Sequence, residues 1–214
     1  MSVLEILGLD EPTNYSVVTA TITECTPDIA MVETRDGTRA VLPASEFYPN
    51  TPFQKGETYQ LLLFERSPTP ICSAVRPELV SAVFSGISPE IREGTVRIVS
   101  IARSAGQRSK VAVAATVAGL DPVAALIGRE ANRVKTVGSL LNGERLDIVA
   151  FHADADRYLM NALAPAAVSR VEIDGDVATA YAPPHQMSAA VGSAGLNSQL
   201  AGQLLGLPVR IAAE

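Results

Sequence analysis

The 214-residue sequence has no long apolar run, only two cysteines and fewer basic than acidic residues. A helix needs about 20 apolar residues to cross a bilayer, so we expect no membrane span. The N-terminal stretch MSVLEILGLDEP carries acids in place of the basic region that opens a secretory signal. Cys25 and Cys72 lack the paired spacing of a metal or redox motif, which indicates reduced thiols in a cytoplasmic protein.

The sequence also lacks the short motifs of common enzyme classes. No GxSxG, HExxH, P-loop or Rossmann fingerprint is present. His152, Asp154 and Asp156 have a spacing that suits metal ligands, but they come directly before a helical pattern, where aspartates favour the helix N-terminus. His185 has no nucleophile motif near it. We therefore predict that the protein is no enzyme and uses no metal or other cofactor.

The formal net charge of −6 argues against a general nucleic-acid coat, but the charge is unevenly distributed. Residues 1–76 hold 5 basic and 10 acidic side chains, and residues 151–214 hold 3 and 6. Residues 77–150 hold 9 and 7, so only the middle third is basic. A surface that binds an anionic partner is therefore expected there.

The first third has the pattern of a small barrel. Short β-prone runs are separated by turn signals, and Asp36-Gly37 marks a tight hairpin. Five such strands in about 60 residues favour a closed barrel of the OB kind. The predicted strands are 14–24, 28–37, 38–43, 57–65 and 71–75.

The rest of the chain contains an internal repeat of α-β-β-α-α-β order, with a period of 64 residues that aligns Gly128 with Gly192 and Leu141 with Leu205. Each copy has the size of a small nucleic-acid-binding module. The first copy is predicted as helix 77–86, strands 93–103 and 109–117, helices 121–128 and 132–142, and strand 145–151. The second is predicted as helix 155–164, strands 167–174 and 177–182, helices 185–192 and 196–206, and strand 208–213.

Seven motifs, in order, resemble the family of the bacterial transcription elongation factor NusA. They are RPELVSAVF, SPEIREGTV, IARSAGQRSKVAV, DPVAALIG, LNGERLDIV, NALAPAAV and VGSAGLNSQLAGQLLG. The resemblance implies an α+β multidomain fold, with an N-terminal S1/OB-type β-barrel followed by two tandem type II KH domains. On this basis we place an N-terminal extension at 1–13, the barrel at 14–76, the first KH domain at 77–150 and the second at 151–214.

The resemblance also implies a function. It is that of a cytoplasmic bacterial protein that binds single-stranded RNA and modulates transcription elongation, pausing, termination or antitermination, with RNA polymerase as a further partner. The family's N-terminal domain, which docks on the polymerase, has no counterpart expected here, because the chain begins almost directly at the barrel. The alternative is a protein-interaction scaffold that docks on the polymerase or another assembly, with RNA binding weakened or lost.

A KH domain holds about four nucleotides against a GxxG loop between two helices. The first copy has GREA at residues 128–131, so the second glycine is replaced by Ala131. A left-handed backbone at Ala131 costs about 1–2 kcal/mol, whereas a helical one costs almost nothing. Because Glu130 opposes the cations, a solvated charged turn is the alternative to RNA binding. The residues expected to contact RNA are Gly128, Arg129, Asn132, Arg133 and Lys135.

The second copy has GSAG at residues 192–195, followed by Asn197, which matches a family asparagine. It keeps both glycines but lacks the usual cations. Backbone amides alone can hold a phosphate, but the acidic segment makes a packing turn the interpretation that we favour. If the loop does bind RNA, its contacts are Gly192, Ser193, Gly195 and Asn197.

Two further features are candidates for RNA contact. The run RSAGQRSK at residues 103–110 joins two strands and matches a family loop, so Arg103, Arg108 and Lys110 are predicted to form an RNA or partner surface. A solvated hairpin is the alternative. Phe47, Tyr48 and Phe53 cluster in a barrel loop where bases could stack, but we favour a role in the core because the barrel lacks a basic groove.

Overall fold

The structure of this chain, a computed structural model, describes residues 14–49, 51–65 and 68–214. The predicted N-terminal extension, residues 1–13, lies outside the described residues. Contacts divide the chain into two units. The first unit holds the described residues up to Gly86 together with 105–107 and 136–144, and the second holds 87–104, 108–135 and 145–214. This division cuts across the predicted first KH domain, so the domain boundaries stay predictions.

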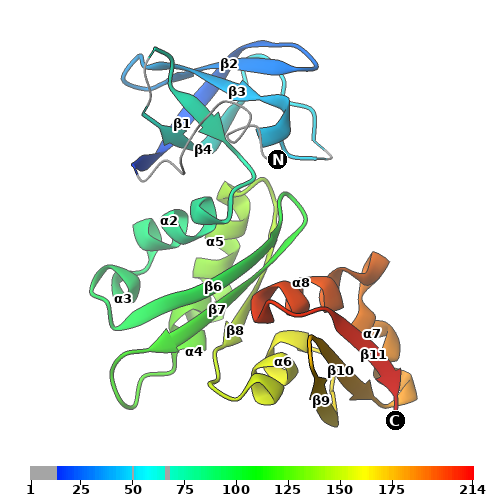
Figure 1. The fold of residues 1–214 in the computed structure, drawn as a ribbon. Coiled ribbons are helices and arrows are strands. Elements are labelled where there is room, and N and C mark those ends of the chain that lie inside the picture. The colour runs from blue at the N-terminus through cyan, green and yellow to red at the C-terminus, as the bar shows by residue number, and fades with distance from the viewer. Residues whose placement is uncertain (1–13, 50, 66–67) are drawn as a thin grey trace. The chain divides into compact units, whose positions relative to one another are not determined.

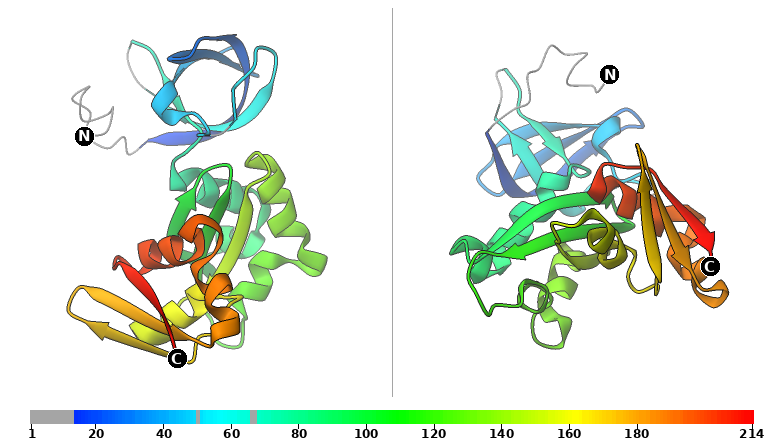
Figure 2. Two further views of the ribbon diagram at one scale, coloured as in Figure 1. Left: turned by 90° about the vertical axis from the view of Figure 1, so that its right-hand side faces the viewer. Right: turned by 60° about the horizontal axis from the view of Figure 1, so that its bottom comes forward.

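Five strands close into a barrel in the first unit, in the order β1-β2-β3-β5-β4, seen as a ring in the left view of Figure 2. Neighbours pair antiparallel except for the parallel pair β3 and β5. Alternate residues such as Ala20 and Ile22 are buried, as the two-residue period of a strand requires. The predicted barrel is confirmed. Its strands are β1 (Tyr15–Cys25), β2 (Ile29–Thr34), β3 (Arg39–Pro43), β4 (Thr58–Phe64) and β5 (Ile71–Ser73).

The aromatic residues after β3 belong to the barrel core. A short 3-10 turn, η1 (Ala44–Glu46), precedes them. Tyr48 and Phe53 are only 3% and 5% exposed, and their rings stack with centroids 5.8 Å apart. Phe47 packs against Phe53 at 4.9 Å. Rings so engaged with one another are not available to stack on bases, in agreement with the packing interpretation.

The first α-β-β-α-α-β copy has the predicted order (Figure 1). Its sheet runs β6-β7-β8, with β6 antiparallel and β8 parallel to β7. Asp121 caps α4 because its side chain accepts from the amides of Val123 and Ala124, at 2.9 and 3.1 Å. The elements are α2 (Pro77–Ile87), α3 (Pro89–Arg92), β6 (Val96–Ser104), β7 (Arg108–Ala115), α4 (Pro122–Ile127), α5 (Asn132–Leu140) and β8 (Arg145–Ala150).

The second copy repeats this order, so the predicted α+β fold with two α-β-β-α-α-β domains is confirmed. Its sheet runs β11-β10-β9, again with one antiparallel and one parallel pair. The elements are α6 (Ala155–Leu163), β9 (Arg170–Asp174), β10 (Val177–Ala182), η3 (Pro184–Gln186), α7 (Met187–Val191), α8 (Leu196–Leu205) and β11 (Val209–Ala213).

The two copies share a core within the second unit. Helices α6 and α8 contact the first copy's sheet as well as their own strands. Tyr158 of α6 forms a hydrogen bond of 2.8 Å with Ser100 of β6. Both copies therefore contribute to one apolar cluster, which includes Ala102, Ala112 and Val149 from the first and Leu159, Leu163, Leu200 and Leu204 from the second.

The candidate metal motif is located at the start of α6. Asp154 occupies the N-cap position by its backbone, but its side chain makes no capping hydrogen bond. Its amide instead donates to His152 Nδ1 at 3.0 Å, and Asp156 lies in the first helical turn. Across the described ranges, no three His, Cys, Asp or Glu side chains gather where they could hold a metal ion. In the same ranges no helix is long and apolar enough to span a membrane.

Candidate nucleic-acid interface

The two candidate loops, residues 128–131 (the first loop) and 192–195 (the second loop), have the same backbone conformation. Gly128 and Gly192 have φ/ψ of 74°/170° and 78°/170°. At the third position Glu130 has 54°/26° and Ala194 has 50°/28°. The fourth position is left-handed in both loops, with φ of 59° at Ala131 and 77° at Gly195. The first loop thus keeps its shape without the second glycine.

The opening glycine of each loop is required by the helix that follows. A Cβ added at Gly192 would lie 2.6 Å from Asn197 Cβ and 2.7 Å from its amide nitrogen. At Gly128 the clash would be with Asn132 Oδ1 and Arg133 Cγ, at 2.4 and 2.7 Å. Close packing, together with a positive φ, therefore accounts for both glycines before any ligand is considered.

Two cations of the first loop region face solvent. Arg129 has a side chain that is 91% exposed and lies 3.9 Å from the equally open Glu130, a separation at which an exposed ion pair contributes little. Lys135 is exposed and donates to the carbonyl oxygen of Glu130 at 3.1 Å. The first amides of α5, which begins at the exposed Asn132, lie beside these cations. The combination suits a phosphate.

Arg133 is placed differently. Its Nη1 lies 2.6 Å from Glu90 Oε2 and 2.6 Å from the carbonyl oxygen of Ala125, and its side chain is 25% exposed. The hydrogen bond from Arg133 lowers the pKa of Glu90 to about 2. The predicted phosphate contact of Arg133 would have to compete with both partners.

Most cations of the basic run at 103–110 form contacts within the protein. Lys110 is fully buried, and its Nζ lies 3.0 Å from Asp147 Oδ2. Burial lowers the pKa of Lys110. Arg108 binds the same oxygen at 2.6 Å, while Arg103 is half-buried on β6. A buried ammonium cannot meet a phosphate, so we withdraw Lys110 from the predicted RNA surface.

A cation that the sequence analysis missed stands at the edge of this cluster. Arg145 is 69% exposed, with its Nε 3.8 Å from Asp147 Oδ1. It pairs in register with Arg108 across the parallel strands β7 and β8. These two residues are 37 positions apart in the sequence. Their proximity therefore becomes evident only from the strand pairing.

The second loop has no cation, and its asparagine is internal. Ser193 and Ala194 are exposed, but Asn197 is fully buried. Its Nδ2 lies within hydrogen-bonding distance of the carbonyl oxygens of Leu163, Ala189 and Ala190, at 3.0, 3.2 and 3.1 Å. The predicted RNA contact by the Asn197 side chain is therefore wrong, because the amide is already engaged inside the domain.

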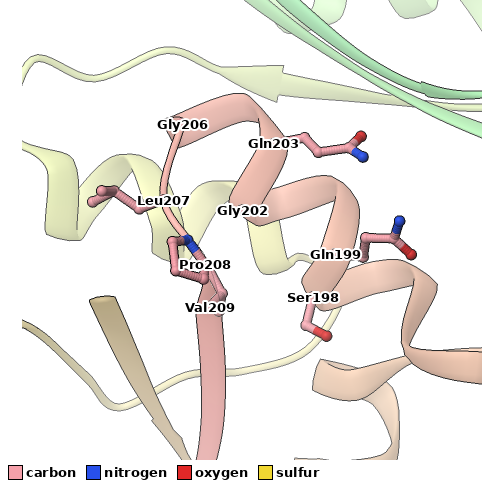
Figure 3. Close-up of a pocket in the computed structure, with 8 residues that line it drawn as sticks. All are labelled: Ser198, Gln199, Gly202, Gln203, Gly206, Leu207, Pro208 and Val209. Atoms are coloured by element: carbon pink, nitrogen blue, oxygen red, sulfur yellow. The ribbon is translucent and has the colours of Figure 1, made fainter. Parts of the chain in front are cut away.

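An open pocket of about 560 Å³ lies along α8 (Figure 3). The Gln199 and Gln203 side chains extend from α8, and Gly202 of the same helix faces the segment by which the chain returns toward β11. A Cβ at Gly202 would be 2.6 Å from the carbonyl oxygen of Leu207. The lining offers hydroxyl and amide groups but no charge. Its residues are Ser198, Gln199, Gly202, Gln203, Gly206, Leu207, Pro208 and Val209.

Comparison with known proteins agrees with this geometry. Residues 75–151 match the NusA-like first KH domain, and residues 155–214 match the NusA-like second KH domain. The chain belongs to the NusA family.

Relatives named "Transcription termination/antitermination protein NusA" match most of this chain. The protein from Mycobacterium tuberculosis is 38% identical over 179 residues, which are 80% of this chain and 52% of the relative. That from Halalkalibacterium halodurans is 35% identical over 182 residues, 82% of this chain and 48% of the relative. That from Thermus thermophilus is 33% identical over 177 residues, 79% and 46%. The chain thus spans about half the length of the NusA proteins it matches.

Proposed function

We propose that this NusA-family chain binds single-stranded RNA and regulates transcription termination or antitermination. The observation that carries the proposal is the shared backbone of the first and second loops, each followed by a helix N-terminus within a NusA-like KH domain. Exposed Arg129 in the first of these loops and exposed Lys135 on α5 add positive charge there.

The two loops would contribute to RNA binding in different ways. The first loop would attract phosphates through Arg129, the neighbouring Lys135 and the amides at the start of α5. The second loop has neutral residues and lies next to the α8 pocket, where Gln199 and Gln203 present amide groups. Side-chain amides can both donate to and accept from base edges. Affinity would therefore depend more on the first loop than on the second.

The family also suggests where the chain would act. Its relatives are named for transcription termination and antitermination, which supports a cytoplasmic protein that works with the transcription machinery, including RNA polymerase. We assign it a binding role without catalysis.

The test is fluorescence anisotropy of a labelled single-stranded RNA at several salt concentrations. Neutralising two phosphate-binding cations on a single strand should reduce the slope of log K against log salt by about 1.4. The double variant R129A/K135A is expected to bind more weakly with this shallower slope. The control variant R39A/R157A removes the same charge from side chains that are 81% and 66% exposed elsewhere, and should retain the slope.

An unchanged slope in R129A/K135A would refute the role of the first loop. Absence of binding by the wild-type chain even at low salt would refute RNA binding altogether. Co-purification with polymerase after nuclease treatment would then support the scaffold alternative.

A further inference from the structure

Arg133 and Asn197 occupy equivalent positions, 64 residues apart, on the first turn of the helix that follows each loop. Both side chains reach back to the preceding helix. Arg133 Nη1 donates to the carbonyl oxygen of Ala125 at 2.6 Å, and Asn197 Nδ2 donates to that of Ala189 at 3.2 Å. Ala125 and Ala189 are also 64 residues apart. The two copies thus make the same contact with different side chains.

Each side chain has another partner near the start of its own domain. Asn197 donates to the carbonyl oxygen of Leu163 at the end of α6. Arg133 pairs with Glu90 of α3, whose carboxylate also accepts from Ser88 Oγ at 2.8 Å. Each residue therefore connects the helices on both sides of its loop to a helix near the start of its domain.

We propose that Arg133 is a positioning residue that holds the first loop in its RNA-binding conformation through Ala125 and Glu90, and that it is not a phosphate ligand. This inference rests on the proposed RNA-binding function. The Arg133 stem also packs under the loop, since Cγ would lie only 2.7 Å from a Cβ at Gly128. The Arg133 side chain is 25% exposed, compared with 91% for Arg129.

The two roles predict opposite effects when Glu90 loses its charge. A phosphate ligand would be released from a competing anion, so RNA binding would become tighter and more salt-dependent. A positioning residue would lose one of the contacts that hold it in place, so RNA binding would weaken. The number of phosphate contacts, and with it the salt slope, would stay the same. Glu90→Gln separates the two without changing side-chain size.

The experiment measures RNA anisotropy for the full chain carrying E90Q, with E130Q as the matched control. Glu130 lies in the same loop region and is 85% exposed, so its substitution removes the same charge without removing an anchor. E90Q is expected to weaken binding about 3- to 10-fold with an unchanged slope, as for the loss of one charge-assisted hydrogen bond. E130Q is expected to strengthen it about twofold. Tighter binding and a steeper slope in E90Q would overturn the proposal.

Hydrogen exchange without RNA tests the positioning role independently of the proposed function. The amides of Gly128 and Ala131 donate to the carbonyl oxygens of Ala124 and Gly128, at 3.0 and 3.1 Å. Both amides should exchange about tenfold faster in R133M and several-fold faster in E90Q, and at the wild-type rate in E130Q. Exchange rates unchanged in R133M and E90Q would overturn the positioning role even if RNA binding were established. If the wild-type chain bound no RNA but these variants still exchanged faster, only the proposed function would be refuted.

Discussion

Ala131 and Gly195 are equivalent residues with left-handed backbones, φ 59° and 77°, but only glycine adopts this conformation without strain. The strain at alanine is about 1–2 kcal/mol, and the greater freedom of glycine in the unfolded chain offsets part of it. We therefore expect Ala131→Gly to raise the free energy of unfolding by about 0.5–1 kcal/mol. Urea unfolding monitored by circular dichroism measures this change.

The second loop supplies the reciprocal substitution. A Cβ at Gly195 would meet no atom within 4 Å, so Gly195→Ala introduces backbone strain and no clash. It should lower the free energy of unfolding by about the amount that Ala131→Gly raises it. Two changes of the same sign would contradict the left-handed assignment at position 131.

Glu90 provides a pH-dependent prediction at the same scale. Its pKa is lowered from 4.5 to about 2 in the folded protein, chiefly by the hydrogen bond from Arg133. The folded state therefore binds this proton less readily than the unfolded state, and the resulting stabilisation is present above about pH 4.5 and is lost as the pH falls toward 2. The stability difference between wild type and Glu90→Gln should be constant from pH 6 to 5 and narrow from about pH 4.5 to 3. A difference that does not vary with pH would contradict the ion pair.

At the scale of elements, Asn197 joins α6, α7 and α8 through three carbonyl oxygens. Asn197→Ala leaves these acceptors without the donor, which should cost about 2–4 kcal/mol. Asn197→Asp keeps the size but aims a carboxylate at them, so it should be more destabilising than alanine at neutral pH. Thermal unfolding of the two variants gives the order. A wild-type stability of Asn197→Asp beside a destabilised Asn197→Ala would indicate that the amide contributes only its volume.

Most elements followed from the sequence because their signals are local. Asp121 with Pro122 predicts the start of α4, and the alternation around Ala20 and Ile22 predicts β1. The 64-residue period holds from α4 and α7 onward but fails in the hairpins, where β6 and β7 have 9 and 8 residues and β9 and β10 have 5 and 6. The short helix α3 was not predicted either.

The site was less predictable, because burial and pairing depend on contacts between distant residues. A basic run predicts an accessible surface, yet Lys110 lies inside and pairs with Asp147 across the parallel strands β7 and β8. In the same way, the match of Asn197 to a family asparagine does not tell whether the side chain contacts a ligand or supports the fold. Sequence alone identified the two loops, but not which of their polar residues support the backbone.

At the scale of the whole molecule, the shared core couples the two KH domains. Leu200 of α8 is 1% exposed and belongs to the cluster that includes Ala102 and Ala112 of the first sheet. Leu200→Ala should cost about 2–4 kcal/mol. If the two domains unfold together, hydrogen-exchange protection should fall by the same amount in β7 and β10.

Leu140 provides the control because it is 38% exposed. Leu140→Ala should leave the protection of both strands nearly unchanged. Loss of protection in β10 alone after Leu200→Ala would show that the first domain is stable by itself.

The shared core also has a consequence for synthesis on the ribosome. The first sheet is complete once β8, which ends at Ala150, has emerged, but α8 begins only at Leu196. At about 5–20 residues per second this interval lasts roughly 2–10 s. During that time Ala102 of β6 and Ala112 of β7 lack α8, which contacts both of these strands in the finished protein. Ribosomes paused within this segment would present an apolar sheet face to chaperones, and that face would disappear when α8 emerged.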